Sequence, residues 1–295
     1  MTSAFRCSAA SEDLTEPIAG TASTVRAFLL VEENGPWGVD AVRDSRLPDE
    51  VKQRLRTLAA HHRVRPLLVR RHGPRSRSSV RVFAGYVHTD KPWLQTAELS
   101  DVREVLDLDL SGLADGASPG LRPHDDPVYL VCTHGRHDAC CAERGRPLCS
   151  ALTSAAPEET WEVSHIGGDR FAANVLVLPH GLYYGRLTPA DADGFVARHR
   201  AGELDVDHLR GRCAWPFSVQ AAEVYLRKHL GELTIPPLEL ESGSRNGEET
   251  EATFVVEGER WNVRVLAHPA EPRQLTCRSL GAAVGTTHVL LGITR

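Results

Sequence analysis

The stretches "VYLVCTHGRHDACCAERGRPLC" (128–149) and "TWEVSHIGGDRFAANVLVLPHGLYYGRL" (160–187) determine the predicted fold. Short apolar runs that end at turn residues predict buried strands, and longer runs with apolar residues three or four apart predict helices. With the segment that follows, they give the order strand, helix, strand, strand, strand, helix. The expected elements are 128–132, 146–155, 160–166, 171–179, 182–187 and 188–202. This alternation predicts an α/β domain, and Pro147 is expected in the first turn of its first helix.

Patterned segments also lie on both sides of this region. Before it, we expect a strand at 25–32, a helix at 47–62 and strands at 64–71 and 80–89. The basic loop at 72–79 is predicted to be the solvated end of a hairpin, with docking of an acidic partner as the alternative. After it, we expect a helix at 217–233, a polar loop at 241–251 and a hairpin at 253–269 that turns at Glu257 and Gly258.

A segment rich in Gly, Pro and Asp at 111–127 indicates a domain boundary. The predicted division is an α/β N-terminal domain (1–122), a middle domain (123–205) and a C-terminal α+β extension of helix and hairpin (206–295). A chain of 295 residues is long enough for more than one domain.

Composition and charge favour a soluble globular protein. The net charge of −5 gives no general attraction to nucleic acid or to an anionic membrane, and no run of about 18 apolar residues is present to span a bilayer. The N-terminal residues lack the basic and apolar regions of a secretory signal, so we expect a cytoplasmic protein. In that compartment disulfides are uncommon, and clustered cysteines more often bind metal or carry out redox chemistry.

Four of the seven cysteines lie between residues 132 and 149. The adjacent pair Cys140 and Cys141 is too close for an unstrained disulfide. Cys132, at the end of a strand, and Cys141, expected in a glycine-rich loop, can instead face one ion or cluster. The spacing is a weak signal by itself, because zinc sites more often show paired C-x2-4-C motifs.

The segment "HIGGD" supplies a second set of candidates. Gly167 and Gly168 argue against a helix, and they allow backbone N–H groups to approach a bound cofactor closely. A glycine turn also brings His165 and Asp169 towards one point. The alternatives are a histidine that only makes structural hydrogen bonds and a carboxylate that pairs with Arg170 in solvent. Thiolates and imidazole together suit iron–sulfur clusters or zinc.

The motifs "CTHGRHDACC", "GRPLCSAL", "WEVSHIGGDRFAANVLVLPHGLYYGRL" and "QAAEVYLR" resemble those of the sucrase/ferredoxin-like family. The resemblance implies a thioredoxin-like core domain and a [2Fe–2S] cluster held by two cysteines and by two histidines in an H-x3-H segment. Cys132 and Cys141 match the two thiolates, and His165 matches the first histidine. The position of the second histidine is Asp169, so this chain departs from the family pattern there.

This departure leaves three interpretations of the fourth ligand. Asp169 binds iron through its carboxylate, another residue supplies the bond, or the site has lost its cluster and only the fold remains. The candidates for another ligand are Cys140, His134 and His137. The cysteines expected to be structural are Cys7, Cys149, Cys213 and Cys277.

The function that follows is one-electron transfer by a [2Fe–2S] centre, with an unknown redox partner protein and no nucleic-acid or membrane partner. The sequence favours an electron carrier over an enzyme that transforms a substrate, because we find neither a carboxylate pair tied to a sugar site nor a nucleotide-binding signature. One alternative is a cluster-free thioredoxin-like thiol oxidoreductase that uses Cys132 or Cys141. Another is a structural zinc site in an interaction module.

Overall fold

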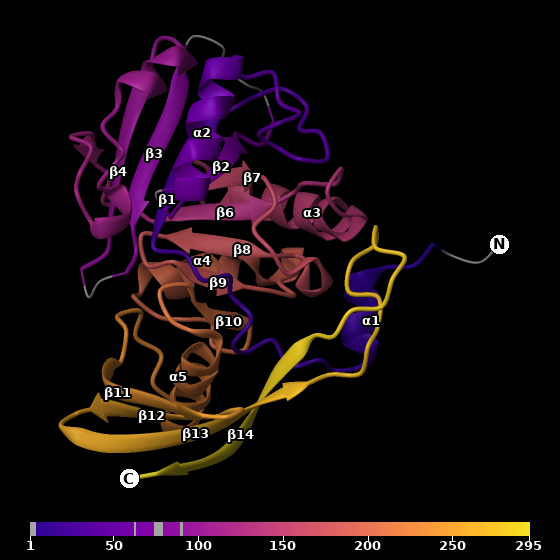
Figure 1. Cartoon of the computed structure of the whole chain (residues 1–295), viewed down its shortest axis with the longest axis vertical. Coiled ribbons are helices and arrows are strands. Elements are labelled where there is room, and N and C mark those ends of the chain that lie inside the picture. The colour runs from indigo at the N-terminus through magenta and orange to yellow at the C-terminus, as the bar shows by residue number, and fades with distance from the viewer. Residues whose placement is uncertain (1–3, 62, 74–78, 89–90) are drawn as a thin grey trace.

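The computed structural model describes residues 4–61, 63–73, 79–88 and 91–295. Within them the strands form a ten-stranded and a four-stranded sheet (Figure 1). The large sheet contains, in spatial order, β10 (Leu209–Arg212), β9 (Leu182–Tyr184), β8 (Val175–Leu178), β6 (Val128–Cys132), β7 (Thr160–Val163), β2 (Val64–Arg70), β1 (Ala27–Glu32), β3 (Val80–Tyr86), β4 (Trp93–Leu99) and β5 (Arg122–Pro123). The small sheet contains β11 (Glu239–Asn246), β12 (Glu249–Val256), β13 (Glu259–Pro269) and β14 (Thr286–Thr294). The α-helices are α1 (Cys7–Asp13), α2 (Asp49–His61), α3 (Ala139–Ala155), α4 (Ala192–Arg200) and α5 (Phe217–Leu230). The 3-10 helices are η1 (Val102–Asp107), η2 (Leu113–Asp115), η3 (Asp169–Phe171) and η4 (Pro189–Asp191).

The middle of the large sheet has a thioredoxin-like arrangement, as the sequence predicted. Strands β6 and β7 are parallel and are joined by α3, while β8 and β9 follow as antiparallel neighbours on the other side of β6. All five residues of β6 are buried, which suits a central strand covered on both faces. The α/β fold class and the predicted order of strands and helices between residues 128 and 202 are confirmed.

Helix α3 begins seven residues earlier than the sequence predicted. Asp138 caps it by accepting a hydrogen bond of 2.9 Å from the backbone N–H of Cys140, so Cys141 lies in the first turn of a helix and not in a loop. Pro147 lies inside the helix. Gly145 also lies in the helix, where a Cβ atom would overlap the carbonyl oxygen of Cys132. This glycine therefore permits close packing of α3 on β6.

The predicted hairpin of β2 and β3 is wrong. Strand β1 lies between them, parallel to β2 and antiparallel to β3, so the connection between β2 and β3 crosses over β1. Residues 74–78 of the predicted basic loop lie outside the described residues. Helix α2 was predicted, and its apolar face packs on this part of the sheet through Val51, Leu55 and Leu58.

The C-terminal region contains one predicted hairpin and one that the sequence did not predict. Strands β12 and β13 pair across Glu257 and Gly258, which both have positive φ, as predicted for a tight turn. The predicted polar loop at 241–251 is wrong, because most of it belongs to β11 and β12, which pair with each other. Most residues of β11 are exposed, so its sequence lacks the alternation of apolar and polar residues that predicts a strand.

The large sheet extends across both predicted domain boundaries. Strand β5 spans residue 122, and β10, beyond residue 205, is an edge strand of the same sheet. The division into three domains stays a prediction. Figure 1 also shows that the yellow segment between β13 and β14 leaves the small sheet and runs beside α1, so late and early parts of the chain lie together.

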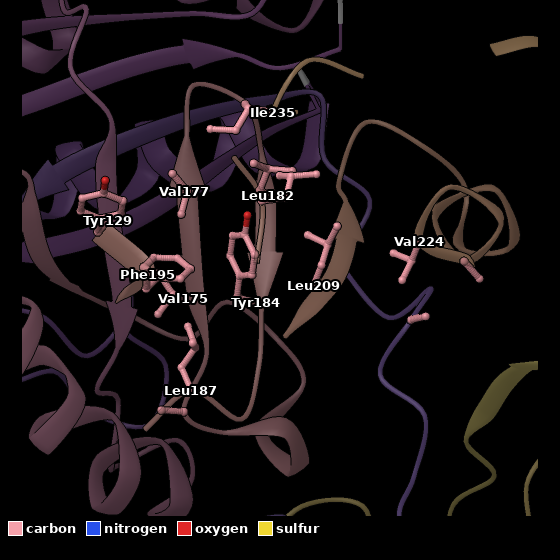
Figure 2. Packing of buried hydrophobic residues seen from close by; sticks show 14 of the residues in the cluster. Tyr129, Val175, Val177, Leu182, Tyr184, Leu187, Phe195, Leu209, Val224 and Ile235 are labelled. Carbon is pink, nitrogen blue, oxygen red and sulfur yellow. The ribbon is translucent and has the colours of Figure 1, made fainter. Parts of the chain in front are cut away.

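A buried cluster on one face of β6, β8 and β9 supports the thioredoxin-like part (Figure 2). Phe195 from α4 packs edge-to-face on Tyr184 of β9, with ring centroids 4.9 Å apart. Burying a side chain of this size contributes about 1.5–3 kcal/mol. This packing fixes the strands, and with them the positions at which β6 and β7 end.

Candidate metal centre

The candidate centre lies where the parallel strands β6 and β7 end. Cys132 is the last residue of β6 and pairs with Val163, the last residue of β7. His165 follows two residues later. Because the carboxyl ends of parallel strands meet at one edge of a sheet, Cys132 and His165 come close together. Helix α3 begins at the same edge and adds Cys141 from its first turn.

The structure brings the four predicted side chains together. The ligand atoms of Cys132, Cys141 and His165 lie within 4.8 Å of one another. The thiol of Cys141 donates to Oδ1 of Asp169 at 3.1 Å, and the same oxygen lies 2.9 Å from Nδ1 of His165. Two thiols and an imidazole thus face one point. The carboxylate of Asp169 joins them through Cys141 and His165, and it also forms a group of possible ligands with His165 and His137.

The two predicted glycines form the turn that directs His165 and Asp169 inwards. Gly167 and Gly168 have φ of 97° and 80°, in the region that favours glycine. A Cβ atom on Gly168 would also overlap the guanidinium of Arg210. The predicted approach of the two glycine N–H groups to a cofactor stays a prediction.

Arg210 is a supporting residue that the sequence did not indicate. Its side chain is 1% exposed, and it donates to the carbonyl of Gly167 and to Oδ1 of Asn174, both at 2.9 Å. Asn174 in turn donates to the carbonyl of Gly168 at 2.9 Å. A buried guanidinium needs such partners, and here they hold the glycine turn in place. Arg210 lies far from the turn in sequence, so no local pattern reveals it.

The three other candidates for the fourth ligand differ in their surroundings. Both ring nitrogens of His134 have backbone partners, namely N–H of His165 at 3.2 Å and the carbonyl of Gly38 at 2.7 Å. Cys140 lies in a different group of thiols. His137 stacks on His165 with ring centroids 3.7 Å apart, and its Nε2 lies 3.9 Å from Oδ2 of Asp169. Of these three residues, His137 is therefore the one best placed to supply the fourth ligand in place of Asp169.

The two thiols have pKa values shifted in opposite directions. The interaction with Cys141 lowers the pKa of Cys132 well below its ordinary value; burial opposes this shift, and His165 adds to it. The same interaction, together with burial, raises the pKa of Cys141. Opposite shifts of this kind are expected when two neighbouring thiols share one proton.

His165 and Asp169 favour their charged forms. Burial alone would lower the pKa of His165, but Asp169 and Cys132 outweigh it and raise that pKa to about 9. Burial would raise the pKa of Asp169, but His165 and Cys141 outweigh it and lower that pKa. Protons on Cys141 and His165 thus hold the negative groups together. A metal cation replaces such protons when these side chains become its ligands.

The residues fit an iron–sulfur or zinc group. Nδ1 of His165 is buried and, among the described residues, lacks a well-aligned hydrogen-bond partner, although Asp169 lies near it. A metal ion can take the place of the proton between this nitrogen and the carboxylate. Thiolates with imidazole are the donors that zinc and iron–sulfur centres use.

The cysteines predicted to be structural divide into two kinds. Cys149 and Cys213 are buried in apolar clusters, where burial raises the pKa of each thiol to about 12, as expected of core residues. Cys7 and Cys277 instead lie beside Cys140. All seven cysteines are free thiols.

The sequence matches the profile of the Sucrase/ferredoxin-like family over residues 18–211. The match covers more than half of the chain, and the protein therefore belongs to this family, as its motifs indicated. The thioredoxin-like strands and all four candidate side chains lie inside the matched region.

Two solved structures are similar to part of the chain. They are crystal structures of two cysteine-to-serine variants of the thioredoxin-like [2Fe–2S] ferredoxin from Aquifex aeolicus, each 20% identical to this chain. The matches cover 28% of this chain and 97% of the ferredoxin chains, with TM-scores of 0.26 and 0.25. No curated protein matches the chain. Among the described residues, no helix combines the length and apolar character needed to cross a membrane.

Proposed function

We propose that this protein is a cytoplasmic one-electron carrier in which Cys132, Cys141, His165 and Asp169 hold a [2Fe–2S] cluster. The observation that carries the proposal is the meeting of two thiols, an imidazole and a carboxylate at the ends of β6 and β7. Membership of the Sucrase/ferredoxin-like family supports the same chemistry. When bound, a cluster of this type takes up and releases a single electron.

The surrounding residues orient and protect the ligands. As a ligand Cys141 would be a thiolate, and its position in the first turn of α3 lets the helix dipole favour that charge. Arg65 donates to the carbonyl of His165 at 3.2 Å, and Arg210 donates to that of Gly167, so the turn is held at both residues. Cys132 and Cys141 are each 1% exposed, which keeps water away from the sulfur atoms.

A redox partner protein is expected to dock on the side of the two histidines. The side chains of His137 and His165 are 36% and 24% exposed, whereas both cysteines are buried. The imidazole of His165 is therefore the candidate ligand nearest to solvent, and it gives the shortest route between the site and a docked protein.

The test is iron and sulfide analysis of protein purified without oxygen. We expect about two iron and two sulfide per chain, in keeping with the cluster type, and loss of both in the Cys141→Ser variant. Cys149→Ser is the matched control, since Cys149 lies on the same helix in an apolar cluster. Full iron in Cys141→Ser with loss in Cys140→Ser would contradict the proposed ligand set.

Two alternative functions have specific support. The low pKa of Cys132 suits a reactive thiol, and the close spacing of Cys132, Cys141 and His165 suits a single zinc ion. A colourless protein that reduces disulfides through Cys132 would favour the thiol oxidoreductase. A colourless protein with one zinc and no sulfide at this site would favour the interaction module.

A further inference from the structure

A second group of thiols lies on the other side of the first turn of α3. Cys140 points away from Cys141 and meets Cys7 of α1 and Cys277 of the segment between β13 and β14. The carboxylate of Asp138 belongs to the same group. Figure 1 shows that the yellow segment between β13 and β14 reaches α1.

The distances within this group suit one metal ion. Sγ of Cys277 lies 3.4 Å from that of Cys140 and 3.6 Å from that of Cys7, and Cys7 Sγ lies 3.6 Å from Oδ1 of Asp138. Zinc–sulfur bonds of about 2.3 Å in a tetrahedron place sulfurs about 3.8 Å apart. Sulfurs in a disulfide are about 2.05 Å apart. The spacing is therefore much nearer to that of thiolates around one ion.

The group is also largely buried, and its surroundings stabilise negative charge, as in a cation-binding site. Cys7 and Cys140 are each 1% exposed, and Asp138 is fully buried. The oxygens of Asp138 accept from the backbone N–H groups of Cys140 and Cys277, at 2.9 and 2.7 Å, which orients the carboxylate. The start of a helix of this length further stabilises negative charge. Three thiols and a carboxylate in such a place match the preferences of zinc.

We propose that Cys7, Cys140 and Cys277 bind a single zinc ion, with the carboxylate of Asp138 as the fourth ligand. This site is separate from the cluster site, because Cys140 and Cys141 contribute to different groups. Cys7 and Cys277 also lie outside the residues that match the family. The inference therefore stands whether or not the iron–sulfur cluster is present.

The zinc ion would hold the segment between β13 and β14 beside the candidate cluster site. Thr276, Arg278 and Ser279 line a cavity of about 250 Å³ with His137 and Asp169. Thr276, Arg278 and Ser279 lie next to Cys277 in the sequence. A metal bound to Cys277 would therefore hold the segment between β13 and β14 against the cluster site. Losing the metal would remove one of the contacts that hold this segment beside Asp169, while the hydrogen bond of Cys277 N–H to Asp138 and the ion pair of Arg273 with Glu16 remain.

Zinc binding can be measured with the cluster site disabled. In a Cys132→Ser/Cys141→Ser protein, reduced and stripped of metal by a chelator, we expect one equivalent of zinc to bind and up to three thiol protons to be released. Adding Cys277→Ser should weaken zinc affinity at least about 100-fold, because it removes a direct ligand, and even the outer partners that orient such ligands are worth about 10–100-fold. Adding Cys213→Ser instead should leave the affinity unchanged, since Cys213 is buried elsewhere.

Further measurements guard against misfolding and separate the two sites. Cobalt(II) in place of zinc should give thiolate charge-transfer absorption that falls in both the Cys7→Ser and Cys277→Ser variants, while their circular dichroism stays that of the parent. In the otherwise unaltered chain, Cys277→Ser should keep the iron and sulfide of the parent and lose only zinc. Failure of the reduced double variant to bind zinc, or unchanged affinity in Cys7→Ser and Cys277→Ser, would overturn the proposal.

Discussion

Asp169 is a buried carboxylate that contacts both a thiol and an imidazole of the candidate centre. As a ligand, its formal charge would distinguish this centre from related ones. With two thiolates, one neutral imidazole and one carboxylate, the site carries one more negative charge than a site with two imidazoles. It carries one fewer than a site with four thiolates. Each added negative charge makes adding an electron less favourable.

We therefore expect a reduction potential between those of the two better-known types. Plant-type ferredoxins lie at about −400 mV and Rieske centres at about −150 to +300 mV. Asp169→His should keep the cluster and raise the potential, and Asp169→Ala should weaken iron retention. Redox titration of the three proteins side by side is the measurement. A full cluster at an unchanged potential in Asp169→Ala would show that Asp169 is not a ligand of the cluster.

The residues of the candidate site could be predicted from the sequence where they lie at the ends of buried strands. Cys132 is the last residue of β6 and His165 follows β7, and parallel pairing brings such positions together. The group of Cys7, Cys140 and Cys277 was not predictable. Cys7 and Cys277 come into contact only because the segment between β13 and β14 runs back to α1. Arg210 was missed for the same reason, since its partners lie far from it in sequence.

Among the elements, α3 shows why glycine gave a misleading signal. Glycine in a helix is usually unfavourable by about 1 kcal/mol relative to alanine, so Gly145 and Pro147 indicated a loop before residue 146. The structure uses Gly145 to bring α3 against the backbone of Cys132. Helix α2 contains neither residue type and was predicted nearly to its ends.

Two helical glycines should respond to alanine in opposite directions. Gly145→Ala would place a methyl group on the backbone of Cys132, and we expect a loss of about 1–3 kcal/mol of stability from overpacking. Gly194→Ala in α4 has nothing within 4 Å of the new Cβ atom, so we expect a gain of up to about 1 kcal/mol. Urea unfolding of both variants measures these changes. Equal stabilisation of the two would mean that α3 does not rest on β6 as described.

Strands were predicted well where they are buried and poorly where they are exposed. The five buried residues of β6 form an apolar run, whereas β11 is polar and mostly exposed. Pairing with β12 keeps β11 extended without an apolar face. The order of β2, β1 and β3 could not be derived either, because a turn-rich loop fits a hairpin and a crossover equally well.

Glu16 connects distant parts of the fold through one buried carboxylate. It pairs with Arg170 of η3 at 2.9 Å and with Arg273 of the C-terminal segment at 2.8 Å, and it accepts a hydrogen bond from Ser11 at 2.8 Å. Burial would raise the pKa of Glu16, but Arg170, Ser11 and Arg273 outweigh it and lower that pKa.

Glu16 should therefore stabilise the fold at neutral pH and less so in acid. Its pKa is lower in the folded chain than the unfolded value of about 4.3, so the stabilisation is present above that pH and is lost as the pH falls through the lower folded value. At pH 7 we expect Glu16→Gln to cost on the order of 1–3 kcal/mol, because it leaves buried charges without their partner.

Urea unfolding of the parent and of Glu16→Gln at several pH values tests this. The difference in unfolding free energy should shrink as the pH is lowered from 7 to below 4. Other carboxylates titrate in both proteins, so the difference reports on Glu16. A gap that stays constant with pH would show that its charge does not matter.

The meeting of Cys7 with Cys277 also imposes an order on how the protein is made. The two residues are 270 positions apart, and a ribosome that adds about 5–20 residues per second needs roughly 14–54 s to pass from one to the other. During that time α1 and α3 have only two of the three thiols. A nascent chain therefore cannot trap a metal ion with the full set of thiolates until translation has passed Cys277, by which point every strand of the large sheet has already been synthesised.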